Sequence, residues 1–436
     1  MPACCGPAKR RWPSPGREEA PTPPRSSCQP TPKTSWTWRS WNCSASRAGR
    51  GRADAVTTPK QRILHVYKDY YPVVGGIENH IRLLAEGQAA QGRQVAVLAT
   101  SLTSRTVVEE RGGVQVFKAG RAATVASMPI SITLPIMLGR LRPHITHLHF
   151  PYPLGETAQL LFGRGRPTVI TYHSDVVRQQ GWLRLYEPIL RRVLRRADCI
   201  LATSPNYIQS SSYLQAVRDR CQVVPLGIEV ARFRAAPAAA VADLRARFGA
   251  PLYLFVGRLR YYKGLPHLLQ ALQGLPGHLV VVGEGAMRST WEHEARQLGV
   301  ADRVHFVGEV EDEDLPTYYH ACDLFILPAT QRSEAFGAVL LEAMASGRPV
   351  ISTELGTGTS WVNQDGETGL VVPPADPQAL RGAMERLMDD EALRTRLGQE
   401  ALRHAQGFDV RALVEQVLAV YDEVLSGPKT HRWDKE

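Results

Sequence analysis

The chain has 436 residues, 44% hydrophobic and 22% charged, so it is long enough and apolar enough for about two or three domains with sizeable cores. Its net charge of +10 and isoelectric point near 9.4 would suit a nucleic acid or an acidic membrane surface as a partner. Residues 1–60, however, hold eleven Lys and Arg against three Asp and Glu, a charge of +8 that leaves only +2 for the remainder. A nearly neutral body argues against a nucleic-acid partner.

Residues 1–60 show neither helical nor strand periodicity, and Pro21, Pro23 and Pro24 interrupt any helix. Aliphatic residues are almost absent, so burial cannot offset the entropy of ordering this segment. A secretory signal would need an apolar stretch, and the prolines disfavour the amphipathic helix of a transit peptide. We expect a disordered tail, or a true start near Val56, in preference to a functional arm.

The body contains three widely spaced cysteines, Cys199, Cys221 and Cys322. This usage is typical of reduced thiols in a cytoplasmic protein and indicates neither a disulfide framework nor a zinc site. The stretches 122–139 and 264–283 lack charge almost entirely, but prolines and polar residues interrupt both. We therefore expect no membrane-spanning segment.

Short β-branched runs alternate with amphipathic helical patterns along the body, as in parallel α/β folds. One series fills residues 61–228 and a second fills 251–408, separated by an Ala-rich linker at 229–250. We expect residues 409–436 to form a helix that crosses back to the first domain, followed by a tail. Two such series predict two doubly wound, Rossmann-like domains, with a ligand at the carboxyl ends of the strands in the cleft between them. The predicted strands are Ile63–Tyr67, Val95–Ala99, Ile145–His149, Thr168–Tyr172, Cys199–Thr203, Leu252–Val256, Leu279–Val282, Val304–Val307, Leu324–Leu327 and Val350–Ser352.

Two glycine-containing loops follow predicted strands. Gly75 and Gly76 precede a helix, where small residues let backbone amides approach an anion, although such a turn is also common for geometric reasons alone. In the second domain, Gly257-Arg258 and Lys263-Gly264 follow a strand. Two cations at the mouth of a cleft suit a diphosphate, and the alternative is a solvated charged turn.

A third motif places two carboxylates between a strand and a helix. Glu334 falls in the loop and Glu342 on the helix, with Phe336 and Gly337 between them. The loop carboxylate can hold sugar hydroxyls, the helical one can hold a ribose, and the helix N-terminal amides can take phosphate oxygens. Glu342 stands among Leu340, Leu341, Ala343 and Met344, so it does not fit a simple surface charge.

Together these motifs resemble the retaining glycosyltransferases of family 4, which have the two-domain GT-B fold. The resemblance spans roughly Arg62 to Glu423 and rests on the order of the motifs. Besides those above, they include Thr171-Tyr172-His173-Ser174-Asp175, Val224-Pro225-Leu226-Gly227-Ile228 and Val281-Val282-Gly283-Glu284-Gly285.

The resemblance implies transfer of a sugar from a nucleotide-sugar to a hydroxyl with retention of configuration. Arg258 and Lys263 would then bind the diphosphate and Glu342 the ribose. Glu334, with the amides near Phe336 and Gly337, would hold the donor sugar. Gly75 and Gly76 would close the pocket, and His173 would reach the sugar from the far side. A lone histidine is more often structural, but its place at a strand end favours the site.

No cofactor and no metal are expected, because Arg258 and Lys263 can stabilise the charge on the departing diphosphate. Asp312-Glu313-Asp314 resembles the acidic triplet of metal-dependent glycosyltransferases. It precedes a helix expected at Leu315, so we interpret it as helix capping. No carboxylate is placed as a covalent nucleophile, and the resemblance implies front-face attack, with the leaving phosphate taking the acceptor proton.

The stretch Arg178–Arg196 carries six arginines and one acid among apolar residues. As a helix it has an apolar stripe with a basic rim, which suits either an anionic membrane surface or a core-facing helix with snorkelling arginines. Similar enzymes often act on polyprenyl-linked saccharides, which favours peripheral attachment at the inner membrane face.

Two segments resemble mannosyl- and rhamnosyltransferases of O-antigen assembly, namely His173–Gln179 and Gly356–Trp361. They favour GDP-mannose as donor and a saccharide or lipid-linked saccharide as acceptor, in polysaccharide biosynthesis. The alternatives are a transferase that uses UDP-glucose or UDP-N-acetylglucosamine, and a non-catalytic GT-B binding module.

Overall fold

The computed structural model describes residues 41, 61–73, 75–125, 128–176 and 180–427, with only the backbone for 180–184. All of them belong to one compact unit. The predicted tail 1–60 thus lies outside the described residues, with the exception of Trp41. The Trp41 side chain is fully buried in the core of the first domain, which departs from the expectation of a tail without packing partners.

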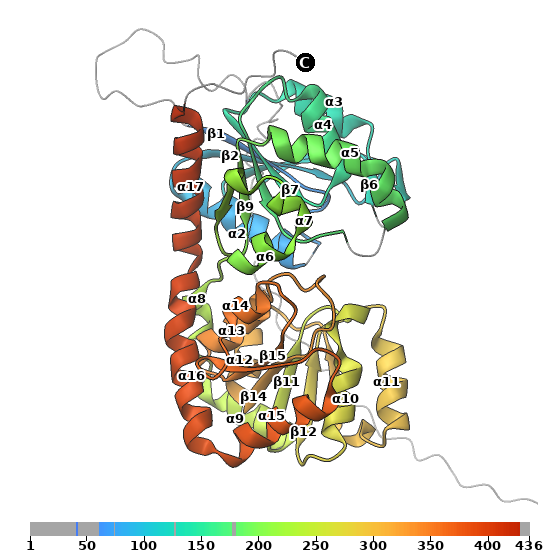
Figure 1. The fold of residues 1–436 in the computed structure, drawn as a ribbon, viewed down its shortest axis with the longest axis vertical. Helices are drawn as coiled ribbons and strands as arrows, with labels where there is room; N and C mark the ends of the chain where they lie inside the picture. Colours follow the sequence, from blue (N-terminus) through green and yellow to red (C-terminus); the bar gives the residue numbers. More distant parts are fainter. Residues whose placement is uncertain (1–40, 42–60, 74, 126–127, 177–179, 428–436) are drawn as a thin grey trace, which may run out of the picture. The chain divides into compact units, whose positions relative to one another are not determined.

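The first domain is built on an eight-stranded sheet with the order β10-β9-β8-β7-β1-β2-β4-β3. All neighbouring strands are parallel except β3 and β4. The first strand lies in the middle and the chain winds outward to both sides, as in a doubly wound fold (Figure 1). The strands are β1 Arg62–Val66, β2 Gln94–Thr100, β3 Val107–Arg111, β4 Val114–Ala119, β7 Ile145–Phe150, β8 Thr168–Tyr172, β9 Cys199–Ala202 and β10 Cys221–Val223, with a separate hairpin of β5 Ala123–Val125 and β6 Met128–Ile130.

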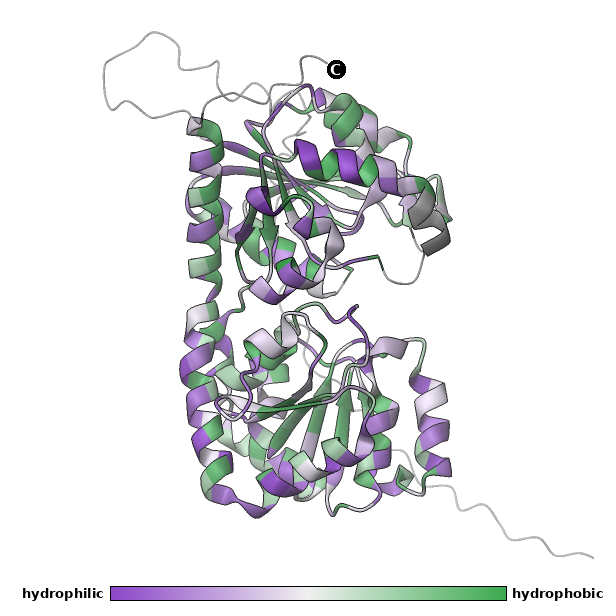
Figure 2. Ribbon diagram, in the orientation of Figure 1, coloured by the Kyte–Doolittle hydropathy of each residue, from purple (hydrophilic) through white to green (hydrophobic). Residues whose placement is uncertain are grey.

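The second domain has a six-stranded, wholly parallel sheet with the order β13-β12-β11-β14-β15-β16. Its strands are strongly apolar because helices cover both faces, and Figure 2 shows them mostly green beneath helices of alternating colour. The strands are β11 Leu252–Val256, β12 His278–Val282, β13 Val304–Gly308, β14 Leu324–Leu327, β15 Val350–Thr353 and β16 Gly369–Val372.

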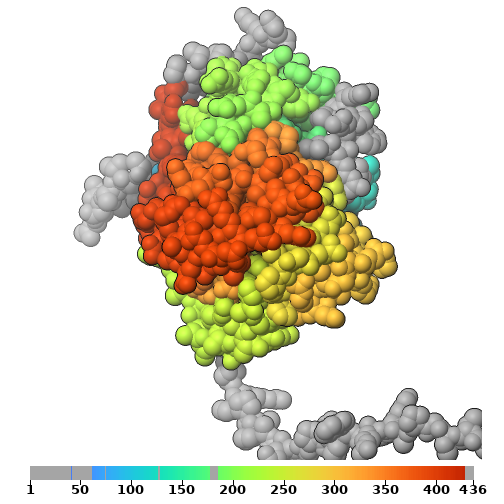
Figure 3. Space-filling view, turned by 60° about the horizontal axis from the view of Figure 1, so that its bottom comes forward, coloured from blue at the N-terminus to red at the C-terminus, as the bar shows by residue number. Residues whose placement is uncertain are grey.

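Helices connect these strands and cover the sheets. In the space-filling view, α15 and α16 form much of one face of the second domain in orange-red, beside the yellow segment that includes α10 (Figure 3). The helices up to the second sheet are α2 Gly76–Ala90, α3 Thr133–Arg140, α4 Pro153–Phe162, α5 Gln180–Arg196, α6 Pro205–Ser210, α7 Ser212–Gln215, η1 Arg218–Arg220, α8 Val230–Phe233 and α9 Ala238–Phe248. Those that follow are η2 Tyr261–Lys263, α10 Leu265–Leu272, α11 Arg288–Gln297, η3 Ala301–Arg303, α12 Leu315–Ala321, α13 Ala338–Ala345, α14 Thr359–Val362, α15 Pro377–Asp389, α16 Glu391–Ala405, η4 Gln406–Phe408 and α17 Val410–Ser426.

The last helix returns to the first domain. Helix α17 lies beside α2 (Figure 1), and its Val414, Leu418 and Tyr421 belong to the core of the first domain. Just before it, Asp409 forms an isolated parallel bridge with Ile228 at the end of the first βα series. The segment predicted as a linker contains α8 and α9, whose Phe233 and Phe248 are buried in the core of the second domain.

Helix α5 faces the core. Leu190, Val193 and Leu194 are buried in the first domain, while Arg191, Arg192 and Arg195 are exposed on the opposite side. Of the two arrangements expected for this stretch, the described part of α5 therefore has the one in which the apolar side faces the core and the arginines extend to the surface. The side chains at 177–184 lie outside the described part. No described helix combines the length and the apolar character needed to span a membrane.

Candidate active site

A buried ion pair joins two of the predicted site residues. The Nζ atom of Lys263 lies 2.7 Å from an Oε atom of Glu334, and the two residues are 7% and 8% exposed. Burial alone would lower the pKa of Lys263, but the nearby charges of Glu334, Tyr262 and Glu342 outweigh it, so the pKa is raised above 10.5. Lys263 therefore remains a cation in a region of low dielectric.

A glycine fixes the place of Lys263. The chain reverses at Gly264 with φ +71°, and a side chain there would overlap the carbonyl oxygen of Pro328 at the end of β14. Only glycine permits both this backbone conformation and this close approach. The loop after β11 thus packs against the strand that leads toward Glu334.

Arg258 is exposed in the loop after β11, and its charge acts on two residues of the first domain. Burial raises the pKa of Glu78, and the positive charge of Arg258 acts in the opposite direction. Burial also raises the pKa of Tyr67 well above 10, and Arg258 again opposes the shift. The guanidinium therefore lies close enough to both groups to act on their charges.

Glu342 lies on α13, where its carboxylate accepts a hydrogen bond from the Tyr319 hydroxyl at 2.7 Å. Burial raises the pKa of Glu342 to about 7, although this hydrogen bond lowers it. The helix begins after Gly337, which adopts φ +76°. The Phe336 side chain is 3% exposed and packs in the core, so Phe336 can offer a ligand only its backbone.

Glu342 also lines a small pocket. Its other walls include Asn79 of α2, Arg232 of α8 and Asp312, so residues of both domains contribute. Arg232 forms ion pairs with Asp312 at 3.7 Å and with Glu229 at 3.8 Å.

The triplet Asp312–Asp314 stands directly before helix α12, as the capping interpretation expected. Helix α12 does begin at Leu315, and Asp314 is its N-cap residue, but the Asp314 side chain makes no capping hydrogen bond. Asp312 forms an ion pair with Arg232 of α8.

Gly75 and Gly76 form the start of α2. Gly75 is the N-cap residue in extended conformation, and a side chain there would collide with the Glu78 carboxylate, which folds back over it. A side chain at Gly76 would meet nothing within 4 Å. The amides of α2 are therefore next to a carboxylate of the same helix, and the open space lies at Gly76.

His173 follows β8 and is 3% exposed. Its Nε2 atom lies 3.1 Å from Nδ1 of His149, and its Nδ1 atom has no hydrogen-bond partner among the residues that the structure describes. It belongs to a cluster of five buried histidines, which also contains His65, His80, His147 and His149.

Comparisons with known proteins identify the family. The description "Glycosyltransferase Family 4" matches residues 74–232, and "Glycosyl transferases group 1" matches residues 241–404. The D-rhamnosyltransferase WbpZ of Pseudomonas aeruginosa is 38% identical over 78% of this chain and 90% of its own length. The O-antigen chain mannosyltransferase C of Escherichia coli is 37% identical over 84% of this chain and 99% of its own length. The chain belongs to glycosyltransferase family 4.

Solved structures agree with the fold. The sucrose-phosphate synthase of Thermosynechococcus elongatus superimposes with a TM-score of 0.72 at 25% identity, covering 84% of this chain and all of that one. The lipopolysaccharide glycosyltransferase WaaG gives a TM-score of 0.63 at 20% identity, covering 84% of this chain and all of that one. The predictions of a GT-B fold and of a hexosyltransferase that uses a nucleotide-sugar donor and a saccharide acceptor are confirmed.

In this glycosyltransferase the predicted residues fall into three places. Lys263 and Glu334 are in direct contact, and Glu342 is close enough for its charge to act on Lys263. The charge of Arg258 acts on Glu78, whose carboxylate lies beside Gly75. His173 lies within the histidine cluster of the first domain.

Sequence reasoning missed the other members of that cluster and one link between the domains. Arg332 lies 3.3 Å from the Asp175 carboxylate, which also accepts hydrogen bonds from the hydroxyls of Tyr172 at 2.7 Å and Ser211 at 2.8 Å. Asp175 belongs to a motif that was recognised, but its partner is 157 residues away. The available signal for the histidines was the alternation His147-Leu148-His149, which places two imidazoles on one face of a strand.

Proposed function

We propose that the protein transfers mannose from GDP-mannose, with retention of configuration, to a saccharide or polyprenyl-linked saccharide during O-antigen or related polysaccharide assembly. The observation that carries this proposal is the similarity to the rhamnosyl- and mannosyltransferases, which extends over most of both chains.

Each group of the site has a part in this proposal. Arg258 and Lys263 bind the diphosphate, Glu342 the ribose, and Glu334 with the amides of Phe336 and Gly337 the donor sugar. Gly75 and Gly76 close the pocket, and His173 contacts the sugar. The buried ion pair supports this assignment, because Glu334 keeps Lys263 positively charged in a buried region. A positive charge attracts a diphosphate more strongly in such a region of low dielectric than it would in water.

The chemistry follows from where charge develops. The bond between the anomeric carbon and the diphosphate oxygen breaks as the acceptor oxygen forms the glycosidic bond on the same face. The acceptor proton passes to the leaving phosphate oxygen. Fixed cations and helix-terminal amides stabilise the negative charge on the diphosphate as it forms. We propose that Arg258 and Lys263 provide this stabilisation without a metal ion, and Asp312 supports this, because it is engaged with Arg232.

A donor screen tests the proposal. The purified protein would be given GDP-mannose, GDP-rhamnose, UDP-glucose and UDP-N-acetylglucosamine, and release of the nucleoside diphosphate would be measured with and without a lipid-linked acceptor. We expect turnover of GDP-mannose that survives excess chelator. A UDP-sugar as the preferred donor would contradict the donor assignment, and complete, metal-rescued loss would contradict metal independence.

Substitutions test the proposed roles of Lys263 and Glu334. We expect Lys263→Ala to lower kcat by about 10²- to 10³-fold, the usual loss for one stabilising group at a developing anion. Glu334→Ala should also impair turnover. The matched control is Lys118→Ala, which removes another lysine paired with a glutamate, Glu109 at 2.6 Å, in the sheet of the first domain. Unchanged turnover in Lys263→Ala would refute its role.

A further inference from the structure

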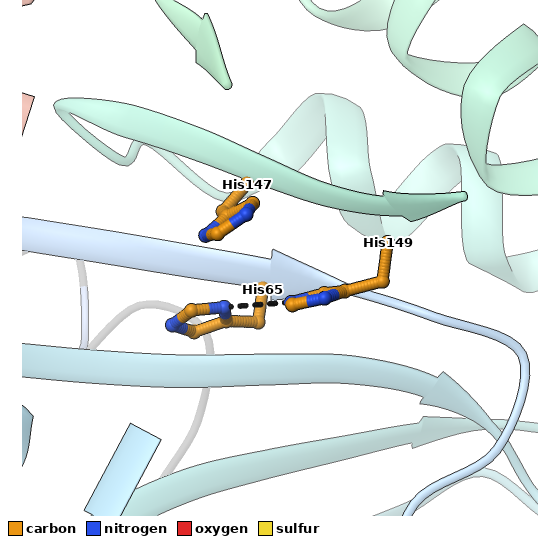
Figure 4. Close-up of side chains that lie close together, drawn as sticks. All are labelled: His65, His147 and His149. Atoms are coloured by element: carbon orange, nitrogen blue, oxygen red, sulfur yellow. Dashed lines mark hydrogen bonds between the residues drawn. The ribbon is translucent and has the colours of Figure 1, made fainter. Parts of the chain in front are cut away.

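The buried histidine cluster brings side chains from several elements together. His65 lies on β1, His147 and His149 on β7, His80 on α2, and His173 after β8. Figure 4 shows His65, His147 and His149 with their rings gathered on one face of the neighbouring strands β1 and β7, and a hydrogen bond between His65 and His149. All five are at most 4% exposed.

These imidazoles are neutral, and this restricts their hydrogen bonds. Burial lowers the pKa of His65 to about 4 and of His80 to about 3, and it lowers those of His147, His149 and His173 well below 6.5. A neutral imidazole has one N–H donor and one acceptor nitrogen. In a row of such rings, fixing the proton on one ring therefore fixes it on the next.

Tyr421 of α17 supplies the starting point. Its hydroxyl oxygen lies 2.5 Å from Nδ1 of His147 and 3.5 Å from Nε2 of Gln88. The Gln88 amide N–H donates to the Tyr421 hydroxyl oxygen, so the hydroxyl proton is left for Nδ1 of His147, its other neighbour. The Tyr421 hydroxyl therefore donates to His147 and accepts from Gln88. His147 in turn donates through Nε2 to the Thr171 hydroxyl at 2.7 Å.

The orientation of the Gln88 amide then fixes which nitrogen carries the proton in each ring of the histidine row, which runs from His65 through His149 to His173. Since its amide nitrogen faces Tyr421, its carbonyl oxygen faces Nε2 of His65 at 2.9 Å, and His65 must donate there. Nδ1 of His65 is then an acceptor, so Nε2 of His149 donates to it at 3.0 Å. By the same step, Nε2 of His173 donates to Nδ1 of His149 at 3.1 Å.

The row ends at Nδ1 of His173. This atom carries no proton in that arrangement, is buried, and has no partner among the described residues. An unpaired acceptor in a buried place has a free-energy cost, so a hydrogen-bond donor from outside the chain would relieve it. Both ring nitrogens of His80 also lack a partner in the described part, and its ring lies edge-on 5.2 Å from that of His173.

We propose that Tyr421, Gln88, His65 and His149 are positioning residues that hold His173 as the Nε2–H tautomer, so that its Nδ1 atom accepts a hydrogen bond from a substrate hydroxyl. The proposal rests on the proposed function, in which His173 contacts the donor sugar. It adds that this contact is with an O–H group, because a phosphate or carbonyl oxygen has no proton to offer an acceptor nitrogen. It also links the C-terminal helix to the site.

A metal ion is the competing use of such a cluster. Two groups of three histidines, His65-His147-His149 and His80-His149-His173, have ring nitrogens within 4.8 Å of one another. A metal would need their lone pairs. The lone pairs on Nδ1 of His65 and His149 already accept N–H groups of neighbouring rings.

Nitrogen-15 NMR of the full chain labelled at histidine tests the proposal without substrate or turnover, so its outcome is independent of the donor assignment. The two neutral tautomers interchange the shifts of the two ring nitrogens, and single histidine variants assign the signals. We expect protonated Nε2 and unprotonated Nδ1 in His65, His149 and His173. Protonated Nδ1 in His173 would overturn the proposal, as would stoichiometric zinc in the purified protein.

The variant Tyr421→Phe tests whether the Tyr421 hydroxyl determines the direction of the hydrogen bonds along the histidine row. Without the hydroxyl, the side-chain amide of Gln88 can rotate by 180°. The direction of every hydrogen bond in the row can then reverse, so we expect a mixture of both tautomers at His173. The control is Tyr253→Phe, which removes the hydroxyl of another buried tyrosine, bonded to the carbonyl of Pro276 in the second domain, and it should leave the His173 signals unchanged. A pure Nε2–H signal in Tyr421→Phe would overturn the role of Tyr421.

Discussion

At the scale of single residues, the site combines groups whose charge states differ through their surroundings. Lys263 and Glu342 are both buried enough for desolvation to be the largest influence on their pKa values. Lys263 has a carboxylate at 2.7 Å that outweighs this effect. Glu342 has a neutral hydroxyl at that distance, and burial raises its pKa to about 7. One group is therefore permanently charged, and the other titrates near neutral pH.

This difference predicts a pH dependence of donor binding. In the proposed role of Glu342, a ribose hydroxyl donates to its ionised carboxylate, so a protonated Glu342 must lose its proton before the donor binds. With a pKa of about 7, the ionised fraction falls about tenfold from pH 8 to pH 6, so we expect KM for the nucleotide-sugar to rise by about tenfold over that range. Initial rates across the range measure it.

Glu342→Gln is the control for this effect, since it keeps a carbonyl acceptor but cannot titrate. We expect weaker donor binding that is flat with pH. A KM that still rises toward pH 6 in this variant would place the titrating group elsewhere, for example at Glu156, whose pKa is also raised to about 7 by burial.

At the scale of elements, α5 carries charge on one side and core contacts on the other. Leu190, Val193 and Leu194 are buried and cannot insert into lipid, whereas Leu185 near the start of the helix is 75% exposed. The arginines at 191, 192 and 195 are exposed, and Arg191 also forms an ion pair with Glu187 at 2.7 Å. We propose that any attachment to a membrane through this helix is electrostatic, at about 1 kcal/mol for each basic residue near an anionic surface.

Vesicle flotation tests this form of attachment. We expect binding to anionic vesicles at low salt, no binding to neutral vesicles, and release at high salt because exposed charges are screened. The triple variant Arg191→Ala, Arg192→Ala, Arg195→Ala should lose the binding. Its control replaces Arg394 and Arg396 of α16 with alanine. Binding that resists high salt would instead indicate insertion of apolar side chains.

Elements differ in how well the sequence predicts them. The buried parallel strands were found because they are continuous apolar runs, such as β12 with four of its five residues buried. Strand β3 was missed because all five of its residues are exposed, which leaves no alternation to detect. Strand β10 has three residues, too few for a periodic signal.

The site follows a similar rule. Motifs identified Lys263, Glu334 and Glu342 as separate candidates, since each stands in a recognisable local pattern. Their contacts were not predictable, because the pairing of Lys263 with Glu334 depends on how Gly264 packs against Pro328. The histidine row is spread over several elements and starts from Tyr421, on a helix more than 200 residues further along the chain, so only the folded chain brings it together.

At the scale of the whole molecule, the described residues connect the two ends of the chain to one core. Tyr421 of α17 and Trp41 of the N-terminal segment are both fully buried in the first domain. Gln94 at the start of β2 donates a hydrogen bond of 3.4 Å to the carbonyl of Trp41. The strongly basic N-terminal segment therefore supplies at least one side chain to the fold, which its composition did not indicate.

This contact predicts that Trp41 contributes to stability. Removing a large buried aromatic side chain leaves a cavity, so Trp41→Ala should lower the free energy of unfolding by about 3–5 kcal/mol, measured by denaturant unfolding of the full chain. The control is Leu185→Ala, because Leu185 is 75% exposed and a surface change of this kind should stay within about 0.5 kcal/mol. Equal stability of the two variants would show that Trp41 does not occupy the core, and that the packed chain begins at β1.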